Sequence, residues 1–264
     1  VTSAVEHPAV LEPCRALAED GWDLTILPVD DRGRLDPDEL RRALRPDTVL
    51  ATVMHANNEV GTIEPIAEIA AICREHDVWL HTDAAQSVGK IPVDVDDLGV
   101  DFLTIAGHKF HGPKGVGALY VRSGREIPSL IRGAAHEAGR RAGTENVLEI
   151  VGLGEAARIA HEELAAGMPR NRALRDRLHT GLVRELGDLR VNGDLEHGLP
   201  NTLSVCFRGL DAATLLAEIG DRVAASAGAA CHADGVDLST VLAAMHVPLD
   251  EAMGTVRFSV GRTT

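Results

Sequence analysis

Lysine is scarce in this sequence, and one lysine stands in a setting that suits covalent chemistry. The chain holds 26 lysine and arginine residues, of which the lysines are Lys90, Lys109 and Lys114. Lys109 follows Gly107-His108 and is itself followed by the glycine-rich segment HGPKGVG. A lysine that forms a Schiff base must be neutral when it attacks, and its surroundings tune its pKa. Lys109 is therefore a candidate Schiff-base lysine, and the alternative is an ordinary solvated charge.

A carboxylate that could work with such a lysine stands earlier in the chain. Asp83 follows the short apolar run 78–82, which predicts a buried strand. A carboxylate at the end of such a strand is costly without a cationic partner. Pyridoxal phosphate requires a carboxylate beside its pyridinium nitrogen, so Asp83 and Lys109 together could serve that cofactor. The alternative for Asp83 alone is a helix cap.

The four cysteines have no paired or CxxC spacing and predict neither a disulfide framework nor a zinc knuckle. They are Cys14, Cys73, Cys206 and Cys231. The first three fall on predicted helices or strands and are expected in the core. Cys231 follows the small-residue stretch 224–230 and precedes His232, so we expect an exposed, mobile loop in which His232 could lower the thiol pKa. The alternatives are a merely exposed thiol, or a metal site formed with His232 and Asp234.

The elements that must position these residues follow an alternating pattern. Short apolar runs at 47–54, 78–82, 102–106 and 116–121 predict strands, and the helical periodicity of 65–76 places a helix between the first two. This is the pattern of a parallel sheet flanked by helices, in which ligands bind beyond the carboxyl ends of the strands. We therefore expect the three polar segments that follow the first three strands to converge on one cleft. These segments are 55–59, 83–86 and 107–109.

The last third of the chain has a different pattern. Residues 145–166 and the arginine-rich segment from Pro169 to about Leu186 predict two consecutive long helices. Apolar runs at 201–207 and 256–260 predict strands, with helical stretches at 211–219 and 239–245 between them. We therefore expect a large domain at 1–165 and a smaller C-terminal α/β domain at 166–264.

Composition excludes several classes of protein. The 26 basic residues against 40 acidic ones give a net charge of −14, which argues against binding to nucleic acid. No apolar run approaches the length of a membrane span, and the first residues lack the pattern of a signal peptide. We expect a cytoplasmic protein that binds no membrane.

Seven segments, in order, closely resemble the pyridoxal-phosphate-dependent cysteine desulfurases of the NifS/IscS type, in the class V aminotransferase family, and the related selenocysteine lyases. The segments are EHPAVL (6–11), HANNEVG (55–61), HTDAAQSVGK (81–90), GHKFHGPKGVGALY (107–120), GRRAGTEN (139–146), SAGAAC (226–231) and RFSVGR (257–262). They extend over nearly the whole chain, which makes the resemblance more specific than any single motif.

This resemblance implies an α/β architecture of the PLP-dependent transferase fold type I, with a mostly parallel sheet in the large domain, a smaller C-terminal α/β domain, and a homodimer. It also implies a role for each of nine residues. Lys109 matches the Schiff-base lysine, Asp83 the partner of the pyridine nitrogen, and Gln86 the donor to the phenolic oxygen. His7 matches the imidazole stacked on the ring and, with Lys109, is a candidate base. His108 matches a phosphate ligand, and Thr144 a ligand of the other protomer's cofactor phosphate. Asn58 matches a cofactor-binding residue that, like Arg257, lies near the substrate carboxylate, and Cys231 matches the nucleophile that accepts sulfur.

The implied reaction converts L-cysteine to L-alanine and leaves the sulfur as a persulfide on Cys231. An acceptor protein then takes up the sulfur, for example for iron–sulfur cluster assembly. L-Selenocysteine is the alternative substrate, and an aminotransferase or a kynureninase-like lyase is an alternative reaction. Relatives have an earlier segment that cradles the phosphate and a helix beyond Thr264, so we expect an internal fragment of a longer protein. A cofactor-free fragment that only dimerises and docks a partner is the remaining alternative.

Overall fold

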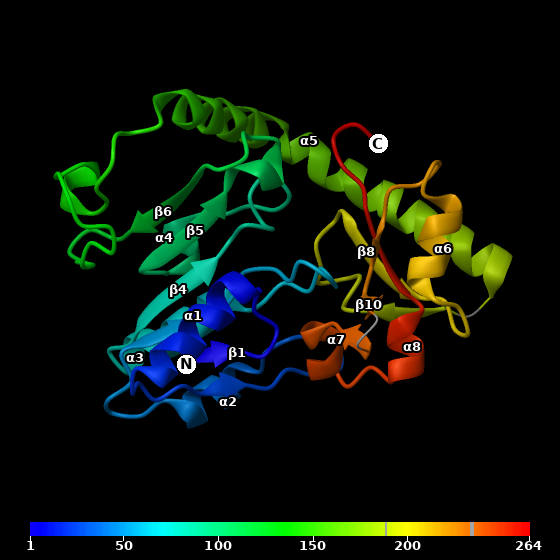
Figure 1. The fold of residues 1–264 in the computed structure, drawn as a ribbon, viewed down its shortest axis with the longest axis horizontal. Helices are drawn as coiled ribbons and strands as arrows, with labels where there is room; N and C mark the ends of the chain where they lie inside the picture. Colours follow the sequence, from blue (N-terminus) through cyan, green and yellow to red (C-terminus); the bar gives the residue numbers. More distant parts are fainter. Residues whose placement is uncertain (188, 233–234) are drawn as a thin grey trace.

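A computed structural model of the chain describes residues 1–187, 189–232 and 235–264, with the backbone alone for 229–232 and 235–237. Two α/β parts lie next to each other, and one long helix, α5 (Val147–Leu186), runs along both of them (Figure 1). No helix in the described part of the chain is both long and apolar enough to cross a membrane.

The first part is built on a six-stranded sheet. Its strands are β1 (Thr2–Ser3), β2 (Ile26–Leu27), β3 (Leu50–Thr52), β4 (Trp79–Asp83), β5 (Phe102–Ala106) and β6 (Gly117–Val121), in the order β2-β1-β3-β4-β5-β6. All neighbours pair in parallel except β5 and β6, which are antiparallel. The four strands predicted for this part are confirmed, whereas the two-residue strands β1 and β2 are too short to produce a sequence pattern.

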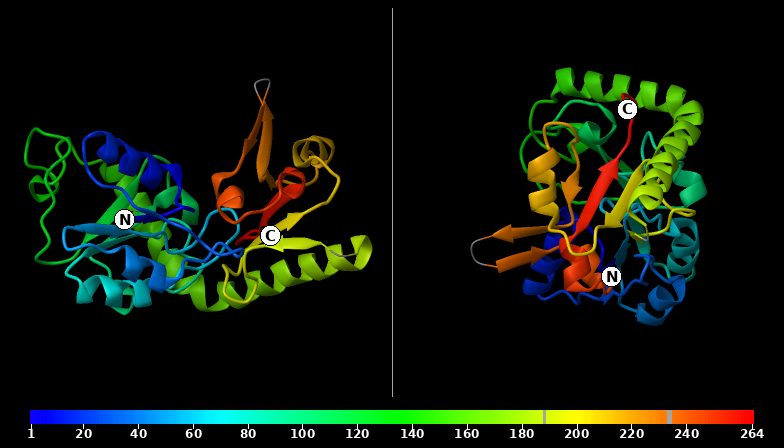
Figure 2. Two further views of the ribbon diagram at one scale, coloured as in Figure 1. Left: turned by 90° about the horizontal axis from the view of Figure 1, so that it is seen from below. Right: turned by 90° about the vertical axis from the view of Figure 1, so that its right-hand side faces the viewer.

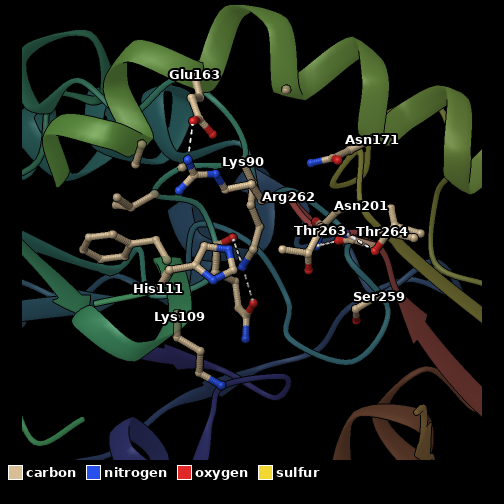
Figure 3. Close-up of a pocket in the computed structure, with 18 of the residues that line it drawn as sticks. Lys90, Lys109, His111, Glu163, Asn171, Asn201, Ser259, Arg262, Thr263 and Thr264 are labelled. Atoms are coloured by element: carbon tan, nitrogen blue, oxygen red, sulfur yellow. Dashed lines mark hydrogen bonds and ion pairs between the residues drawn. The ribbon is translucent and has the colours of Figure 1, made fainter. Parts of the chain in front are cut away.

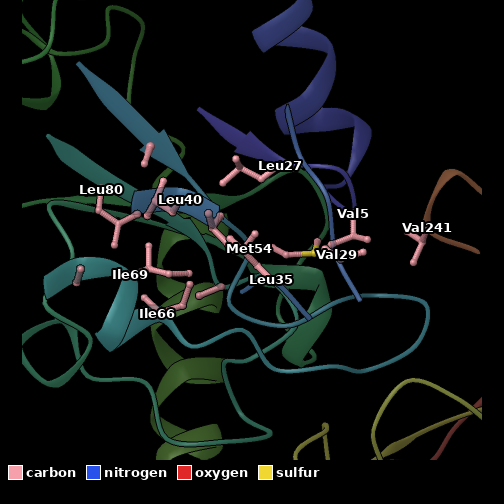
Figure 4. Packing of buried hydrophobic residues seen from close by; sticks show 14 of the residues in the cluster. Val5, Leu27, Val29, Leu35, Leu40, Met54, Ile66, Ile69, Leu80 and Val241 are labelled. Carbon is pink, nitrogen blue, oxygen red and sulfur yellow. The ribbon is translucent and has the colours of Figure 1, made fainter. Parts of the chain in front are cut away.

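Helices cover this sheet and bury one apolar core. They are α1 (Pro8–Glu19), α2 (Pro37–Ala43), α3 (Ile66–Glu75) and α4 (Val95–Leu98), with short 3-10 turns η1 (Gly107–Phe110) and η2 (Glu137–Gly139). The apolar face of α3 places Ile66, Ile69 and Cys73 against strand residues such as Leu80. Figure 4 shows this cluster, in which Leu35, Leu40 and Ile69 are fully buried.

The helix α5 corrects one expectation. The sequence predicts a break near Pro169, but residues 147–186 form one continuous helix of 40 residues with Pro169 inside it. A proline removes one backbone donor and lowers helix stability without always ending a helix. The predicted boundary between residues 165 and 166 falls within α5, and the division into domains stays a prediction.

The second part holds a four-stranded antiparallel sheet. Its strands are β7 (Arg190–Asn192), β8 (Thr202–Cys206), β9 (Ser226–Ala227) and β12 (Thr255–Ser259), in the order β7-β8-β12-β9. Its helices are α6 (Ala212–Ile219), α7 (Thr240–Ala244) and α8 (Leu249–Met253). Val241, Leu242 and Met245 of α7 and the residue after it pack into the core of the first part, so the two parts are in direct contact.

Within the described residues, strands β10 (Ala229–His232) and β11 (Gly235–Leu238) pair only with each other. They form a two-stranded ribbon that projects from the second part (Figure 2). Cys231 lies in β10, opposite Val236. The expectation that Cys231 lies outside regular structure is therefore wrong for its backbone. Asp234, which the metal alternative requires, lies outside the described residues.

Candidate active site

A cavity of about 770 Å³ opens where the two parts meet. Its walls include five of the residues predicted for the site: Asn58, Gln86, His108, Lys109 and Arg257. In Figure 3 Lys90, Lys109 and His111 enter from the first part, whereas Asn171, Asn201 and Ser259 enter from α5 and the second part. The volume lies within the range of roughly 300–1,000 Å³ that is typical of small-molecule sites.

The ends of three neighbouring parallel strands form one wall of this cavity, as the sequence predicts. Asn58 follows β3, Gln86 follows β4 and Lys109 follows β5, and these strands pair side by side. Beneath them the ring of His81 joins the strands, because its Nδ1 lies 2.7 Å from the hydroxyl of Thr52 and its Nε2 lies 2.8 Å from that of Thr104. Burial lowers the pKa of His81, so this bridge is a neutral imidazole at pH 7.

Lys109 lies on the 3-10 turn that follows β5. The amide of Gly112 closes this turn by donating to the carbonyl of Gly107 over 2.8 Å. A Cβ atom at position 112 would lie 2.8 Å from that same oxygen, so only glycine fits there. The turn leaves Lys109 and His108 exposed at the open cavity.

Lys90 holds the side chain of Gln86 in one orientation. Its Nζ donates to the Gln86 carbonyl over 2.9 Å and to Gln86 Oε1 over 2.7 Å. Because Oε1 is occupied, the amide NH₂ of Gln86 remains as the donor for a ligand. Burial, together with the charges of Lys109 and Arg257, lowers the pKa of Lys90 to about 8.

Asp83 ends β4 and lies half-buried, three residues before Gln86. Its Oδ1 accepts the amide of Ala85 over 2.8 Å. Asp83 therefore supports the turn after β4 through a side-chain hydrogen bond to the backbone, as a helix cap does. A cap is the alternative interpretation of this residue from the sequence. Asp83 does not line the cavity, although Gln86 does.

His7 begins helix α1 as its N-cap. Its Nδ1 accepts the amide of Ala9 over 3.1 Å, and the ring is exposed. His7 does not line the cavity, but it lies close enough to the carboxylate of Glu59 for its charge to favour ionisation of that group. Glu59 directly follows Asn58, so His7 lies near the cavity mouth.

Arg257 connects the two parts at the cavity. Its Nη1 donates to the carbonyl of Asn58 over 2.6 Å and its Nη2 to Ser226 Oγ over 3.0 Å. Its Nε and the side-chain oxygen of Asn58 are buried, and neither has a hydrogen-bond partner among the residues that the structure describes. Such groups are costly unless a ligand satisfies them, so this wall suits a polar, anionic ligand.

Two predicted site residues lie elsewhere in this single chain. Thr144 is exposed in the segment before α5 and does not line the cavity. Cys231 lies on the projecting ribbon, where the described backbone does not fix the place of its thiol. No cluster of metal-ligating side chains occurs in the part of the chain that the structure describes.

Sequence reasoning missed three groups around the cavity. The sequence alone assigns no role to Lys90, although its spacing of four residues from Gln86 in HTDAAQSVGK is compatible with a contact between the two side chains. Glu59 was recognised only as part of a polar segment. Ser239, which donates to Glu59 Oε2 over 2.5 Å, follows the ribbon and had no signal in the sequence.

The residues that surround the cavity fit pyridoxal phosphate. Lys109 and Gln86 provide an amine and an amide donor in the cavity wall, and the carboxylate of Asp83 lies at the end of β4, outside the residues that line the cavity. The unpaired Nε of Arg257 adds a cationic donor on the facing side. This donor set matches an aldehyde, a ring nitrogen, a phenolic oxygen and a carboxylate.

Comparison with known proteins agrees with this chemistry. The sequence model described as "Aminotransferase class-V" matches residues 1–264. The chain is 47% identical over 265 residues to "Cysteine desulfurase IscS" of Dictyoglomus turgidum, which covers 100% of this chain and 67% of that protein. It is 49% identical over 264 residues to "Cysteine desulfurase" of Gluconacetobacter diazotrophicus, covering 99% and 66%. The chain thus spans about two thirds of the length of these curated relatives.

Solved structures show the same fold. A "NIFS-LIKE PROTEIN" superposes with a TM-score of 0.91 at 39% identity, over 98% of this chain and 68% of that one. DndA from Streptomyces lividans gives 0.82 at 38% identity, over 98% and 73%, and "SspA in complex with cysteine" gives 0.81 at 36%, over 98% and 72%. These findings confirm the predicted fold class and the predicted resemblance. The chain therefore belongs to the class-V aminotransferase family, as a relative of the NifS/IscS-type cysteine desulfurases.

Proposed function

We propose that this chain forms the catalytic core of a pyridoxal-phosphate-dependent cysteine desulfurase, which converts L-cysteine to L-alanine and transfers the sulfur to Cys231. The observation that carries the proposal is the convergence of Asn58, Gln86, Lys109 and Arg257 on one cavity. The names of its relatives support the same reaction. L-Selenocysteine, which has the same carboxylate and amine, is the alternative substrate.

The bound cofactor would supply an aldehyde that forms a Schiff base with an amine and a ring that takes up the electrons of the bond being broken. Seven residues of this chain would hold it, as the family resemblance implies. Lys109 would bind the aldehyde carbon, Asp83 the ring nitrogen, Gln86 the phenolic oxygen and His7 the ring face. His108, with Thr144 of a second copy, would bind the phosphate, and Asn58 would be a further contact of the cofactor.

The geometry favours Lys109 over His7 as the base that removes the substrate α-proton. Nδ1 of His7 already accepts the amide of Ala9, so a neutral His7 ring has no other lone pair to offer. The side chain of Lys109 is exposed at the cavity. His7 then serves to cover the cofactor ring.

Arg257 would bind the substrate carboxylate. A guanidinium presents paired donors that match the two oxygens of a carboxylate. The unpaired Nε of Arg257 and the unpaired oxygen of Asn58 provide a donor for the carboxylate and an acceptor for the substrate amine on the same wall.

Cys231 would accept the sulfur, because the other three cysteines are poor nucleophiles. Burial raises the pKa of Cys73 to about 12 and also raises those of Cys14 and Cys206. The thiolate of Cys231 would attack the substrate sulfur. An S–S bond then forms, the C–S bond breaks with its electron pair on carbon, and a proton completes alanine. The persulfide would pass its outer sulfur to an acceptor protein.

A second copy of the chain would complete the site. Apolar side chains are exposed on the segment around Thr144, including Leu130 at 94%, Leu148 at 80% and Val151 at 66%. Exposed apolar residues gathered in this way mark association surfaces. A homodimer formed through this segment would cover them and would carry Thr144 towards the partner's cavity.

The test is alanine release from L-cysteine by the full-length protein supplied with pyridoxal phosphate. Mass spectrometry of the peptides should show a gain of one sulfur on Cys231. Cys14→Ala is the matched control and should keep the gain, whereas Cys231→Ala should lose it. Full alanine release by the Cys231→Ala protein would contradict the assignment.

A further inference from the structure

The ribbon that carries Cys231 lies beside helices α6 and α8, and side-chain hydrogen bonds hold the serine at each of its two ends. Ser226 in β9 precedes β10, and Ser239 follows β11 as the N-cap of α7. The two ribbon strands hydrogen-bond only to each other in the described part of the chain. The place of Cys231 therefore depends strongly on how these two ends are held.

Arg257 holds the Ser226 end. The two residues lie opposite each other in the β12–β9 ladder, and Arg257 Nη2 donates to Ser226 Oγ over 3.0 Å. The same guanidinium donates to the carbonyl of Asn58 in the first part over 2.6 Å. One cationic group thus connects this end of the ribbon to the cavity wall.

Glu59 holds the Ser239 end. Ser239 Oγ donates to Glu59 Oε2 over 2.5 Å. Ser239 Oγ also accepts the amides of Val241 and Leu242, in the first turn of α7. Both of those residues are buried in the core of the first part. Burial raises the pKa of Glu59, while Ser239 and the charges of Arg257 and His7 act in the opposite direction.

The two contacts meet on adjacent residues. Arg257 binds the carbonyl of Asn58, and Ser239 binds the side chain of Glu59. Resting on the function proposed above, we propose that Glu59 and Arg257 are positioning residues at the two ends of the Cys231 ribbon, and that a substrate carboxylate binding to Arg257 loosens the Ser226 end, which the β12–β9 ladder still holds. Substrate binding and movement of the sulfur acceptor would then be coupled through one guanidinium.

The coupling follows from the number of donors on Arg257. Two of its nitrogens are engaged with Asn58 and Ser226, while Nε is buried and unpaired. A carboxylate binds a guanidinium best through two parallel bonds along one edge. Every edge of the guanidinium includes at least one of the two engaged nitrogens, and each of these has a second N–H. A bound carboxylate would therefore share a nitrogen with the Asn58 or Ser226 contact and would weaken that contact by drawing the guanidinium towards itself.

Hydrogen–deuterium exchange of the holoenzyme tests this proposal with substitutions at Ser239. Ser239→Asp keeps an oxygen that can cap α7 but cannot donate to Glu59 and places two carboxylates together. Ser239→Thr keeps both functions and is the matched control. We expect exchange in residues 235–239 to rise about tenfold in S239D, the scale of one lost hydrogen bond to a charged group, and to stay at the wild-type rate in S239T.

A second arm adds saturating L-alanine, which has the substrate's carboxylate and amine but no sulfur to transfer. In the wild-type protein we expect exchange to rise in residues 226–232. In turnover assays S239D should lower kcat for persulfide formation with KM nearly unchanged, because substrate still meets Arg257, and S239T should restore kcat.

The proposal is overturned if S239D exchanges like S239T, or if L-alanine leaves residues 226–232 unchanged. Either result can occur in a protein that binds the cofactor and releases alanine from cysteine, in which case the proposed function stands and the anchoring fails. Loss of alanine release by the wild-type protein would instead refute the function, and exchange in S239D would still test the Glu59 contact.

Discussion

The cavity wall and the Cys231 ribbon are built in opposite ways. In the wall, β3, β4 and β5 share hydrogen-bonded ladders, and the ring of His81 crosses all three strands. In the ribbon, β10 and β11 have no other strand partner in the part of the chain that the structure describes. Isolated two-stranded elements are at best marginally stable in water, so the ribbon relies on its attachments.

This difference matches the proposed tasks of the two regions. Groups that hold a cofactor must keep their mutual positions, because small displacements cost much of the rate. A sulfur acceptor must instead meet first the substrate and then the acceptor protein, which requires movement. We therefore expect the wall to be preorganised and the ribbon to depend on the hydrogen bonds at its ends.

The largest effect is expected at Lys109. Lys109→Ala should remove the visible absorbance of bound pyridoxal phosphate and should lower alanine release by about 10³-fold or more, because no other amine replaces the nucleophile and base. The change should leave exchange in the ribbon unaltered, since Lys109 belongs to the wall. Lys114→Ala, an exposed lysine five residues later, is the control and should keep full activity.

Arg257 lies where the two regions meet, so its substitution should affect both. Arg257→Lys keeps the charge but loses the planar pair of donors, and we expect kcat/KM for L-cysteine to fall about 100-fold. Exchange in the ribbon should also rise at the Ser226 end, because Nη2 no longer holds Ser226. An unchanged ribbon with a hundredfold loss of kcat/KM would mean that Arg257 acts on the substrate alone.

The wall rests on two buried acids that hold protons. Glu6 accepts the amide of Met54 and the hydroxyl of Ser3, and Glu64 accepts the amide of Leu35. Burial raises the pKa of each from 4.5 to about 8. The folded state therefore binds more protons than the unfolded state between these values, and stability falls as pH rises through this window.

Between pH 6.5 and 8 we expect each acid to lower the free energy of unfolding by about 1–2 kcal/mol. His55 and Lys90, whose pKa values burial lowers to about 4 and about 8, make stability rise with pH, and they do so mainly below pH 6.5 and above pH 8. Glu6→Gln should remove its share of the slope, which urea denaturation at several pH values measures. Glu12→Gln on the exposed face of α1 should keep it. An unchanged slope in Glu6→Gln would show that Glu6 is ionised in the folded protein.

The same contrast explains what the sequence could predict. Apolar runs predict β3, β4 and β5, and the polar residues that follow them predict that Asn58, Gln86 and Lys109 converge. Strand patterning is a local property of the sequence, and ligands in such sheets bind beyond the carboxyl ends of the strands. The ribbon consists mostly of small residues with little strand propensity. The strand register decides that Cys231 pairs with Val236, and the sequence pattern does not indicate that register. Glu6 and Glu64 look like surface charges until tertiary packing buries them.

The smallest effect is expected at Lys90, which refines the wall without performing its chemistry. Lys90→Met keeps the length of the side chain but removes the two bonds to Gln86, so the Gln86 amide can rotate. We expect the Kd for pyridoxal phosphate to rise about fivefold to tenfold, the scale of one hydrogen bond. Lys90→Arg should recover part of the affinity, because it keeps a donor within reach of Oε1. Since the ribbon contacts neither residue in the described structure, its exchange should not change. A fivefold loss accompanied by faster exchange at Cys231 would show instead that the wall and the ribbon form one cooperative unit.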